Sequence, residues 1–405
     1  MHPLIELEDR YCAHNYHPLP VVLVRGEGPH VWDDQGRRYL DMMSAYSAVS
    51  HGHAHPRIVA ALVAQARTLN IVSRAFHTDR LAAFLERACQ LTGMDMALPM
   101  NTGAEGVETA LKAARKWAWQ VKGVPDGRQE IIACSGNFHG RTIAVCGLST
   151  ERQYREGFGP FPPGLLTVPY GDAAALEAAI TPHTAAFLVE PIQGEGGIVI
   201  PPDGYLAACA EICRRHGVML IADEIQTGLG RTGRLLACEH EGVKPDGLVL
   251  GKALGGGVLP VSMFLARREL MEVFRPGDHG STFGGNPLAA AVGLAALEVL
   301  EDDDLVAQSA AKGAWLLAEL KKIDSPLVKE VRGRGLFIGL EIDPARAPAR
   351  AVVERLMARG LLSKETHATV VRLAPPLGVP QELLAWAVTQ IREVLAEMAP
   401  AGRAD

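Results

Sequence analysis

Short, uninterrupted runs of apolar residues mark the middle of the chain. They are four or five residues long and lack polar alternation, which is typical of strands buried on both faces. The clearest runs are Glu130–Cys134, Ala186–Val189, Val218–Ala222 and Gly247–Leu250. Between two of them, Tyr205–His216 has the length of a helix and is followed by Gly217, a residue suited to a helix C-cap. The order strand, helix, strand predicts a mostly parallel sheet covered by helices.

The segments on either side of this core follow different patterns. Near the start, Val21–Arg25 and His30–Trp32 predict a β-hairpin, and Arg37–Leu40 predicts a third strand. The C-terminal part predicts a smaller α+β domain. Its expected elements are a helix from Pro287 to about Leu300, a helix from about Leu305 to Leu320, and strands at Gly335–Ile342 and Val370–Leu373.

Composition narrows the class of protein. A chain of 405 residues, 48% hydrophobic and 21% charged, is long enough for two or three lobes. The net charge of -6 argues against nucleic acid as a partner, because it offers no basic field for phosphates. The apolar stretch Leu248–Ala266 contains a lysine and five glycines or prolines, so we expect no membrane span there. Residues Met1–Glu6 resemble neither a secretion signal nor a transit peptide, and we expect a cytoplasmic protein.

We expect no metal site in this chain. Cys209 and Cys213 lie four residues apart, but no second Cys/His pair follows to complete a zinc site. His51, His53 and His55 form an alternating string, but the glycine and proline around them favour a turn. The seven cysteines are therefore interpreted as reduced thiols, most of them buried.

Polar residues follow three of the predicted buried strands. Burial in a sheet gives no structural reason for a polar side chain at these positions. Glu190, Asp223 and Lys252 each come directly after an apolar run. Ligands bind at the carboxyl ends of strands in open parallel sheets, so these residues predict a site. The alternative at this stage is a buried Asp–Lys ion pair with a purely structural role.

An aldehyde cofactor such as pyridoxal phosphate explains this lysine and this aspartate. The amine of Lys252 can bond to the cofactor aldehyde, and once released it can act as a base. The carboxylate of Asp223 can keep the pyridine nitrogen protonated, because opposite charges favour the charged form. The phosphate needs a separate site. The small residues of Asn101–Gly106 open a predicted helix at Val107–Lys122, and a helix start of this kind exposes N–H groups to an anion.

Six motifs together resemble the class III aminotransferases, in the order seen in that family and over essentially the whole chain. They are Asn101–Gly103, Phe138–Thr142, Glu190–Glu195, Asp223–Gly228, Gly251–Lys252 and Gly280–Asn286. The resemblance implies an α/β protein of pyridoxal-phosphate-dependent transferase fold type I. Its large domain has a mostly parallel seven-stranded sheet, and a smaller α+β domain is formed by the N- and C-terminal segments. We expect residues 1–55 to belong to the small domain, 56–290 to form the large domain and 291–405 to complete the small one.

The resemblance also implies roles around the cofactor. Lys252 and Asp223 are the expected catalytic residues, Phe138 stacks on the ring and Gln226 lies near its phenolic oxygen. Thr282 reaches the phosphate of a neighbouring subunit, which implies a homodimer with shared sites. Position 139 varies among relatives, so we give His139 no role. Three residues are expected at the phosphate end, namely Thr102, Gly103 and Ala104.

Within the family, Ala13–Pro20 and Ser44–Val49 are most similar to members that act on ornithine. The resemblance implies transfer of the δ-amino group of ornithine to 2-oxoglutarate, giving glutamate and a semialdehyde that cyclises to pyrroline-5-carboxylate. Arg372 is expected to clamp a carboxylate of 2-oxoglutarate with two parallel bonds, and Glu195 to mask this arginine while ornithine reacts. Arg141 and Tyr16 are expected to bind the α-carboxylate of ornithine, and Tyr46 is expected to shape the pocket.

Three other functions remain open at this point. A related aminotransferase could act on acetylornithine, 4-aminobutyrate, lysine or another ω-amine. Residues 228–233 spell GxGxxG, the fingerprint of nicotinamide-dependent enzymes, but the preceding run ends five residues early and no convincing helix follows. A regulator that binds pyridoxal phosphate without catalysis is the third alternative.

Overall fold

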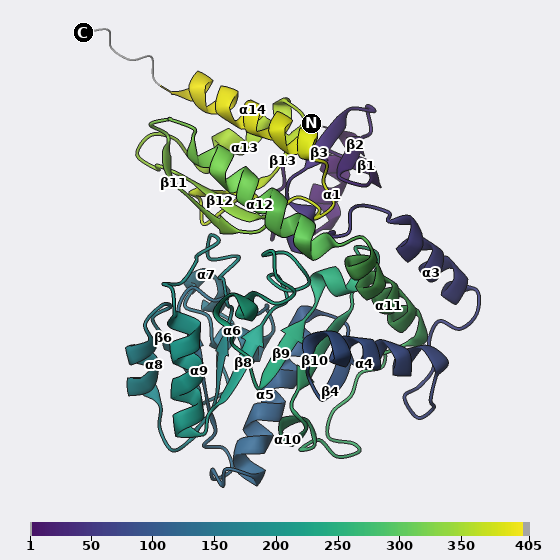
Figure 1. Cartoon of the computed structure of the whole chain (residues 1–405), viewed down its shortest axis with the longest axis vertical. Coiled ribbons are helices and arrows are strands. Elements are labelled where there is room, and N and C mark those ends of the chain that lie inside the picture. The colour runs from purple at the N-terminus through teal and green to yellow at the C-terminus, as the bar shows by residue number, and fades with distance from the viewer. Residues whose placement is uncertain (1, 400–405) are drawn as a thin grey trace.

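A twisted seven-stranded sheet forms the centre of the larger domain in the computed structural model, which describes residues 2–399 (Figure 1). Strand β10 is antiparallel to both of its neighbours, and the other pairings in this sheet are parallel. The spatial order is β4 (Met96–Met100), β10 (Ser262–Ala266), β9 (Gly247–Leu250), β8 (Met219–Asp223), β7 (Thr184–Val189), β5 (Glu130–Cys134) and β6 (Leu165–Val168). The predicted mostly parallel sheet is therefore confirmed.

The apolar runs are strands because both faces of the sheet are covered. In β5, Ile131 and Ala133 face one hydrophobic core, which includes helix α5 (Gly103–Gln120). Ile132 and Cys134 face the opposite core, which includes α9 (Tyr205–His216). A strand that contributes to two cores has no room for polar alternation.

Helix α9 has the predicted bounds, and Gly217 ends it in a left-handed conformation with φ 58°. Helix α5 differs from its prediction, because it begins at Gly103 rather than Val107 and ends at Gln120 rather than Lys122. The cause is a capping box, in which the Thr102 hydroxyl accepts from the Glu105 N–H and the Glu105 carboxylate accepts from the Thr102 N–H. The glycine-rich segment that was expected to precede the helix is its first turn.

Two four-stranded sheets form the smaller domain, in the upper part of Figure 1. One has the order β11 (Val328–Arg334), β12 (Phe337–Ile342), β15 (Val370–Leu373) and β14 (Lys364–Thr366). The other has the order β1 (Leu23–Glu27), β2 (His30–Asp33), β3 (Arg38–Asp41) and β13 (Leu361–Leu362). Because β3 pairs with β13, strands from both ends of the chain share one sheet. The hairpin predicted near the N-terminus is confirmed, whereas β11 was missed.

Helices pack around these sheets and between the two domains. Helix α11 (Pro287–Asp302) runs through residue 290, where the large domain was predicted to end. The position of the domain boundary stays a prediction. Helix α12 (Leu305–Lys321) matches its predicted bounds within a residue. None of the described helices is both long and apolar enough to cross a membrane. The remaining elements are α1 (Pro3–Tyr11), α2 (Ser44–Ser47), α3 (Pro56–Ala66), α4 (Asp79–Thr92), α6 (Ile143–Gly147), α7 (Arg152–Arg155), α8 (Ala173–Ala179), η1 (Ala237–Glu241), η2 (Lys252–Gly255), α10 (Arg268–Met271), α13 (Ala349–Ala358) and α14 (Gln381–Met398).

Replacing Gly313 with alanine is predicted to destabilise the protein, although alanine is the better helix former by about 1 kcal/mol. A Cβ atom on Gly313 of α12 would lie 2.0 Å from the carbonyl carbon of Gly335, in the turn between β11 and β12. We expect Gly313→Ala to lower the free energy of unfolding by about 1–3 kcal/mol in urea denaturation. The exposed neighbour Ala314 serves as the control, since Ala314→Gly should cost only about 1 kcal/mol. A stabilised Gly313→Ala variant would contradict this packing.

Candidate active site

The three polar residues at the strand ends meet around one cavity of about 190 Å³. Glu190 follows β7, Asp223 ends β8 and Lys252 follows β9, so the parallel strands deliver all three to the same edge of the sheet. The other predicted site residues that line the cavity are Gly103, Ala104, Phe138, Glu195 and Gln226. The sequence therefore predicted most of the residues that line this cavity.

Lys252 occupies an unusual backbone position. Its φ of 44° lies in the left-handed region, which costs energy for a residue with a side chain. Burial lowers the pKa of its amine, although the negative charges of Glu195 and Asp223 oppose that shift. A larger fraction of the amine is therefore unprotonated at neutral pH, the form that can bond to an aldehyde.

Asp223 is buried, and both of its carboxylate oxygens have partners. One accepts from the Ile225 N–H at 3.1 Å, and the other lies 2.7 Å from Nδ1 of His139. Burial disfavours the charged form of His139, but the hydrogen bond to Asp223 prevails and raises the pKa of the imidazole. His139 was given no role from the sequence. The strand-end pattern could not find it, because His139 follows β5 in a loop and its partner lies 84 positions away.

Glu190 is the second buried carboxyl group beside this pair. It accepts hydrogen bonds from the N–H groups of Phe138 at 2.8 Å and Gly194 at 3.2 Å. Burial raises its pKa to about 7, against the opposing effect of His139, and the charge of Asp223 adds to the rise. Glu190 thus joins the loop that carries Phe138 to the turn that carries Glu195.

The first turn of α5 forms another wall of the cavity. The N–H groups of Gly103 and Ala104 lie in the first turn of the helix, where they have no intrahelical acceptor. The helix dipole makes this position favourable for an anion. The side chain of Thr102 does not line the cavity with them, because its hydroxyl caps the helix.

Glu195 and Arg372 form an ion pair across the two domains. Nη1 of Arg372 donates to Oε1 of Glu195 at 2.9 Å, and Nε2 of Gln226 donates to the same oxygen at 3.1 Å. Burial opposes the charge on Glu195, but the guanidinium of Arg372 prevails and lowers the pKa of the carboxyl group. Arg372 is only 1% exposed, and its guanidinium carbon lies 5.2 Å from the centre of the Tyr46 ring.

Three predicted residues lie farther out. The guanidinium of Arg141 stacks on the ring of Tyr154, 3.6 Å from its centre, and lies 5.3 Å from the centre of the Phe138 ring. Tyr154 was missed, since nothing in the sequence around α7 marks it. Tyr16 lines a separate apolar groove together with Tyr46 and is 76% exposed. Thr282 is exposed and does not line the cavity of this chain.

The two patterns that suggested other chemistry have local structural roles. Residues 228–233 form consecutive turns between β8 and the short helix η1, without the strand-to-helix passage of a dinucleotide site. Each of the three histidines has a different partner. His51 lies 3.0 Å from the carbonyl oxygen of Ala296, His53 lies 2.8 Å from Asp41, and His55 lies 3.3 Å from Asp303.

The residues present fit pyridoxal phosphate. Oε1 of Gln226 is buried without a hydrogen-bond partner among the described residues, and the free N–H groups of α5 suit a phosphate. Lys252 and Asp223 supply the amine and the carboxylate that such a cofactor requires. Fold and site together define a pyridoxal-phosphate-dependent transferase of fold type I.

Comparison with known proteins identifies the family. The class III aminotransferase family model matches residues 11–395, and the chain belongs to this family, which uses pyridoxal phosphate. An ornithine aminotransferase of Halalkalibacterium halodurans is 58% identical, over 97% of this chain and 98% of the relative. The structure of an ornithine aminotransferase from Toxoplasma gondii has a TM-score of 0.96 at 45% identity, covering 97% and 94% of the two chains. An acetylornithine aminotransferase from Elizabethkingia anophelis has a TM-score of 0.88 at 46% identity, covering 97% and 98%.

Glu190 is predicted to make the stability of the cofactor-free protein depend on pH. Burial raises its pKa from an ordinary 4.5 to about 7 in the folded protein, so its contribution to the free energy of unfolding is fully present below pH 4.5 and is lost as the pH rises through 7. We expect Glu190→Gln to remove this dependence. Relative to wild type, the variant should gain roughly 3 kcal/mol between pH 4.5 and pH 8. Urea denaturation at both pH values checks this, and an equal difference between the two proteins at both would contradict it.

Proposed function

We propose that this enzyme transfers the δ-amino group of L-ornithine to 2-oxoglutarate and forms glutamate. The other product is glutamate 5-semialdehyde, which cyclises to pyrroline-5-carboxylate. The observation that carries the proposal is the ion pair of the buried Arg372 with Glu195, which lines the same cavity as Lys252. The full-length relatives named ornithine aminotransferase, at 55–58% identity, support ornithine rather than another ω-amine.

The ion pair lets one pocket accept two substrates of different charge. Ornithine presents a cationic amine to the cofactor, and its carboxylate must stay away from the reacting end. With Glu195 bound to Arg372, no free guanidinium attracts that carboxylate to the wrong place. The 2-oxoglutarate dianion brings a carboxylate close to the reacting carbon, and Arg372 binds it with two parallel bonds once Glu195 has turned away.

The chemistry itself is divided between the cofactor and two residues. When bound, pyridoxal phosphate supplies a sink for the electrons left when the substrate carbon loses its proton. Lys252 would hold the cofactor, and after release its Nζ would take the proton from the substrate carbon and deliver it to the cofactor carbon. Asp223, oriented by His139 and by the Ile225 N–H, keeps the pyridine nitrogen protonated.

The outer residues would hold the amino acid end of ornithine. In our proposal Arg141 and Tyr16 bind its α-carboxylate, and Tyr46 shapes the pocket between them and Arg372. Stacking on Tyr154 supports this role, because it holds the planar Arg141 guanidinium in place near Phe138, a residue of the cavity wall. Phe138 and Gln226 line the cavity, where Phe138 would stack on the cofactor ring and Gln226 would bind its phenolic oxygen.

We also propose a cytoplasmic homodimer with shared active sites, in which Thr282 reaches the partner's phosphate. Thr282 is exposed, next to Phe283, which is 57% exposed. A second exposed ring, Phe76, lies on a neighbouring segment, since Gly285 closely approaches Arg74. Exposed aromatic side chains on neighbouring segments support the proposal that a partner covers this surface. A reducing compartment is supported by the seven cysteines, all of which are free.

Addition of ornithine to the purified enzyme tests the proposed reaction. We expect the visible absorption of the bound cofactor to bleach with ornithine and to return with 2-oxoglutarate. Acetylornithine and 4-aminobutyrate should act at least about tenfold less efficiently at equal concentration. Lys252→Ala is the control, since it should fold and bind the cofactor but lose turnover by roughly a thousandfold or more. Faster bleaching with acetylornithine would overturn the choice of substrate, and native turnover by Lys252→Ala would overturn the mechanism.

Tyr46→Ile is predicted to change the choice of substrate rather than the chemistry. The ring of Tyr46 lies beside Arg372 and lines the same groove as Tyr16, so its loss should weaken the binding of the ornithine end. We expect kcat/KM for ornithine to fall about tenfold or more, with less effect on the half-reaction with 2-oxoglutarate. Steady-state kinetics with each substrate varied in turn measures this. Unchanged turnover of ornithine would show that the pocket is assigned incorrectly.

A further inference from the structure

The turn that carries Glu195 is compact and bound to the larger domain. We call residues Gly194–Ile198 the gate turn. The N–H groups of Gly197 and Ile198 both donate to the carbonyl oxygen of Gly194 at 3.1 Å, which closes the turn. The preceding residue, Gln193, donates from Nε2 to the carbonyl oxygen of Ser135 at 2.8 Å. The gate turn is therefore a defined unit, and the side chain of Glu195 can move without the turn unfolding.

A row of three residues on the small-domain sheet faces this turn. In the sheet register, Arg332 of β11 pairs with Gly339 of β12, and Gly339 pairs with Arg372 of β15. The two arginines thus flank a glycine. A Cβ atom on Gly339 would lie 3.3 Å from the carbonyl oxygen of Gly197, so a side chain there would crowd the gate turn. The absence of a side chain lets the backbone of the turn lie between the two guanidinium groups.

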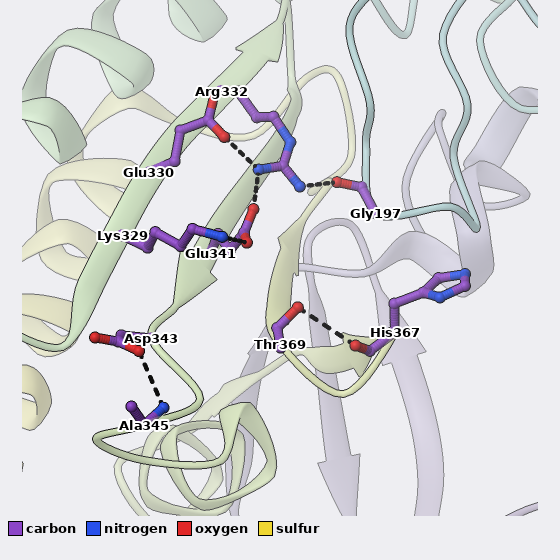
Figure 2. Close-up of polar contacts among 9 residues, drawn as sticks. All are labelled: Gly197, Lys329, Glu330, Arg332, Glu341, Asp343, Ala345, His367 and Thr369. Carbon is purple, nitrogen blue, oxygen red and sulfur yellow. Dashed lines mark hydrogen bonds and ion pairs between the residues drawn. The ribbon is translucent and has the colours of Figure 1, made fainter. Parts of the chain in front are cut away.

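Arg332 donates to the backbone of the gate turn in two places. Its Nη2 donates to the carbonyl oxygen of Gly197 at 2.7 Å, and its Nε donates to that of Ile198 at 3.0 Å. Figure 2 shows the remaining nitrogen, Nη1, turned toward Glu341 at 2.5 Å and Glu330 at 2.7 Å. The two carboxylates fix the guanidinium plane, which leaves the other two nitrogens directed at the turn.

Arg372 binds the other end of the gate turn while it is paired with Glu195. It donates to the carbonyl oxygen of Gly194 at 3.2 Å as well as to the carboxylate of Glu195. Thr366 adds a neutral hydrogen bond to the carbonyl oxygen of Glu195 at 2.8 Å. Among the described residues, the charged side chains that donate to this turn are Arg332 and Arg372. When Arg372 binds a substrate carboxylate, Arg332 is left as the cation on the turn.

We propose that Arg332 is a positioning residue, which keeps the gate turn seated on the small domain while Arg372 is engaged by 2-oxoglutarate. This inference rests on the function proposed above. With the backbone of the turn fixed, exchange of partners at Arg372 requires only rotation of the Glu195 side chain. Without Arg332, the turn would lose its charged anchor in the half-reaction with 2-oxoglutarate, whereas the Glu195–Arg372 pair would still hold it in the half-reaction with ornithine.

Arg332→Gln in the full-length holoenzyme tests this asymmetry. We expect KM for 2-oxoglutarate to rise about tenfold, the equivalent of one lost charge-assisted hydrogen bond, while KM for ornithine stays within about twofold. The dissociation constant of glutarate, a dicarboxylate that has no keto group and cannot react, should rise by the same factor. Arg334→Gln is the matched control, because Arg334 lies on the same strand and pairs with Asp203 instead of the gate turn. It should match wild type in both constants.

Arg332→Lys keeps the positive charge but lacks the fork that reaches two carbonyl groups, so it should show a smaller rise with the same selectivity. If Arg332→Gln does not fold, the KM values of Arg332→Lys test the proposed role of Arg332. Equal increases in both KM values, or a loss of thermal stability with unchanged KM values, would reduce Arg332 to a structural residue and overturn the inference. Wild-type turnover is measured first, because a wild-type enzyme inactive with ornithine would refute the proposed function instead.

Discussion

One ion pair, between Glu195 of the larger domain and Arg372 of the smaller one, determines how the rest of this site is arranged. Arg372 is buried and Glu195 is half-buried, so an unpaired charge on the arginine would be costly and Glu195 compensates it. The pair also joins the two domains, and Glu195 lines the same cavity as Lys252. In the proposed reaction, a substrate carboxylate would replace Glu195 as the partner of this buried guanidinium.

A second group of charges lies deeper, at the ends of the central strands. Asp223, His139 and Glu190 place two carboxyl groups and an imidazole next to one another within the wall of the cavity. Burial raises the pKa of Glu190 and favours its neutral form, whereas Asp223 accepts a hydrogen bond from the Ile225 N–H and pairs with His139. Two carboxyl groups at neighbouring strand ends thus have different chemistry, because the backbone and His139 provide them with different partners.

The sequence predicted the central strands closely, since both faces of the sheet are buried and these strands are almost free of polar residues. It predicted α9 from its length and from Gly217, which ends it. It failed at β11, where Lys329, Glu330 and Arg332 interrupt the apolar pattern because they form ion pairs on the sheet. The same contrast between polar residues and their apolar neighbours explains which residues of the site were predicted. Lys252 and Asp223 stand out against apolar neighbours, whereas His139 and Tyr154 acquire their partners only through tertiary contacts. The register that aligns Arg332 with Arg372 is likewise visible only in the folded sheet.

The short strand β13 has a consequence for the order in which the protein can be built. Its residues Leu361 and Leu362 pair with Leu40 and Asp41, more than three hundred positions earlier. During synthesis, β1 to β3 emerge from the ribosome first and must wait for their parallel neighbour until nearly the whole polypeptide has been made. The larger domain, whose strands lie between these two segments, can collapse during that interval. Completion of the smaller domain, and with it the delivery of Arg372 to the catalytic cavity, is then a late event in the life of each new molecule.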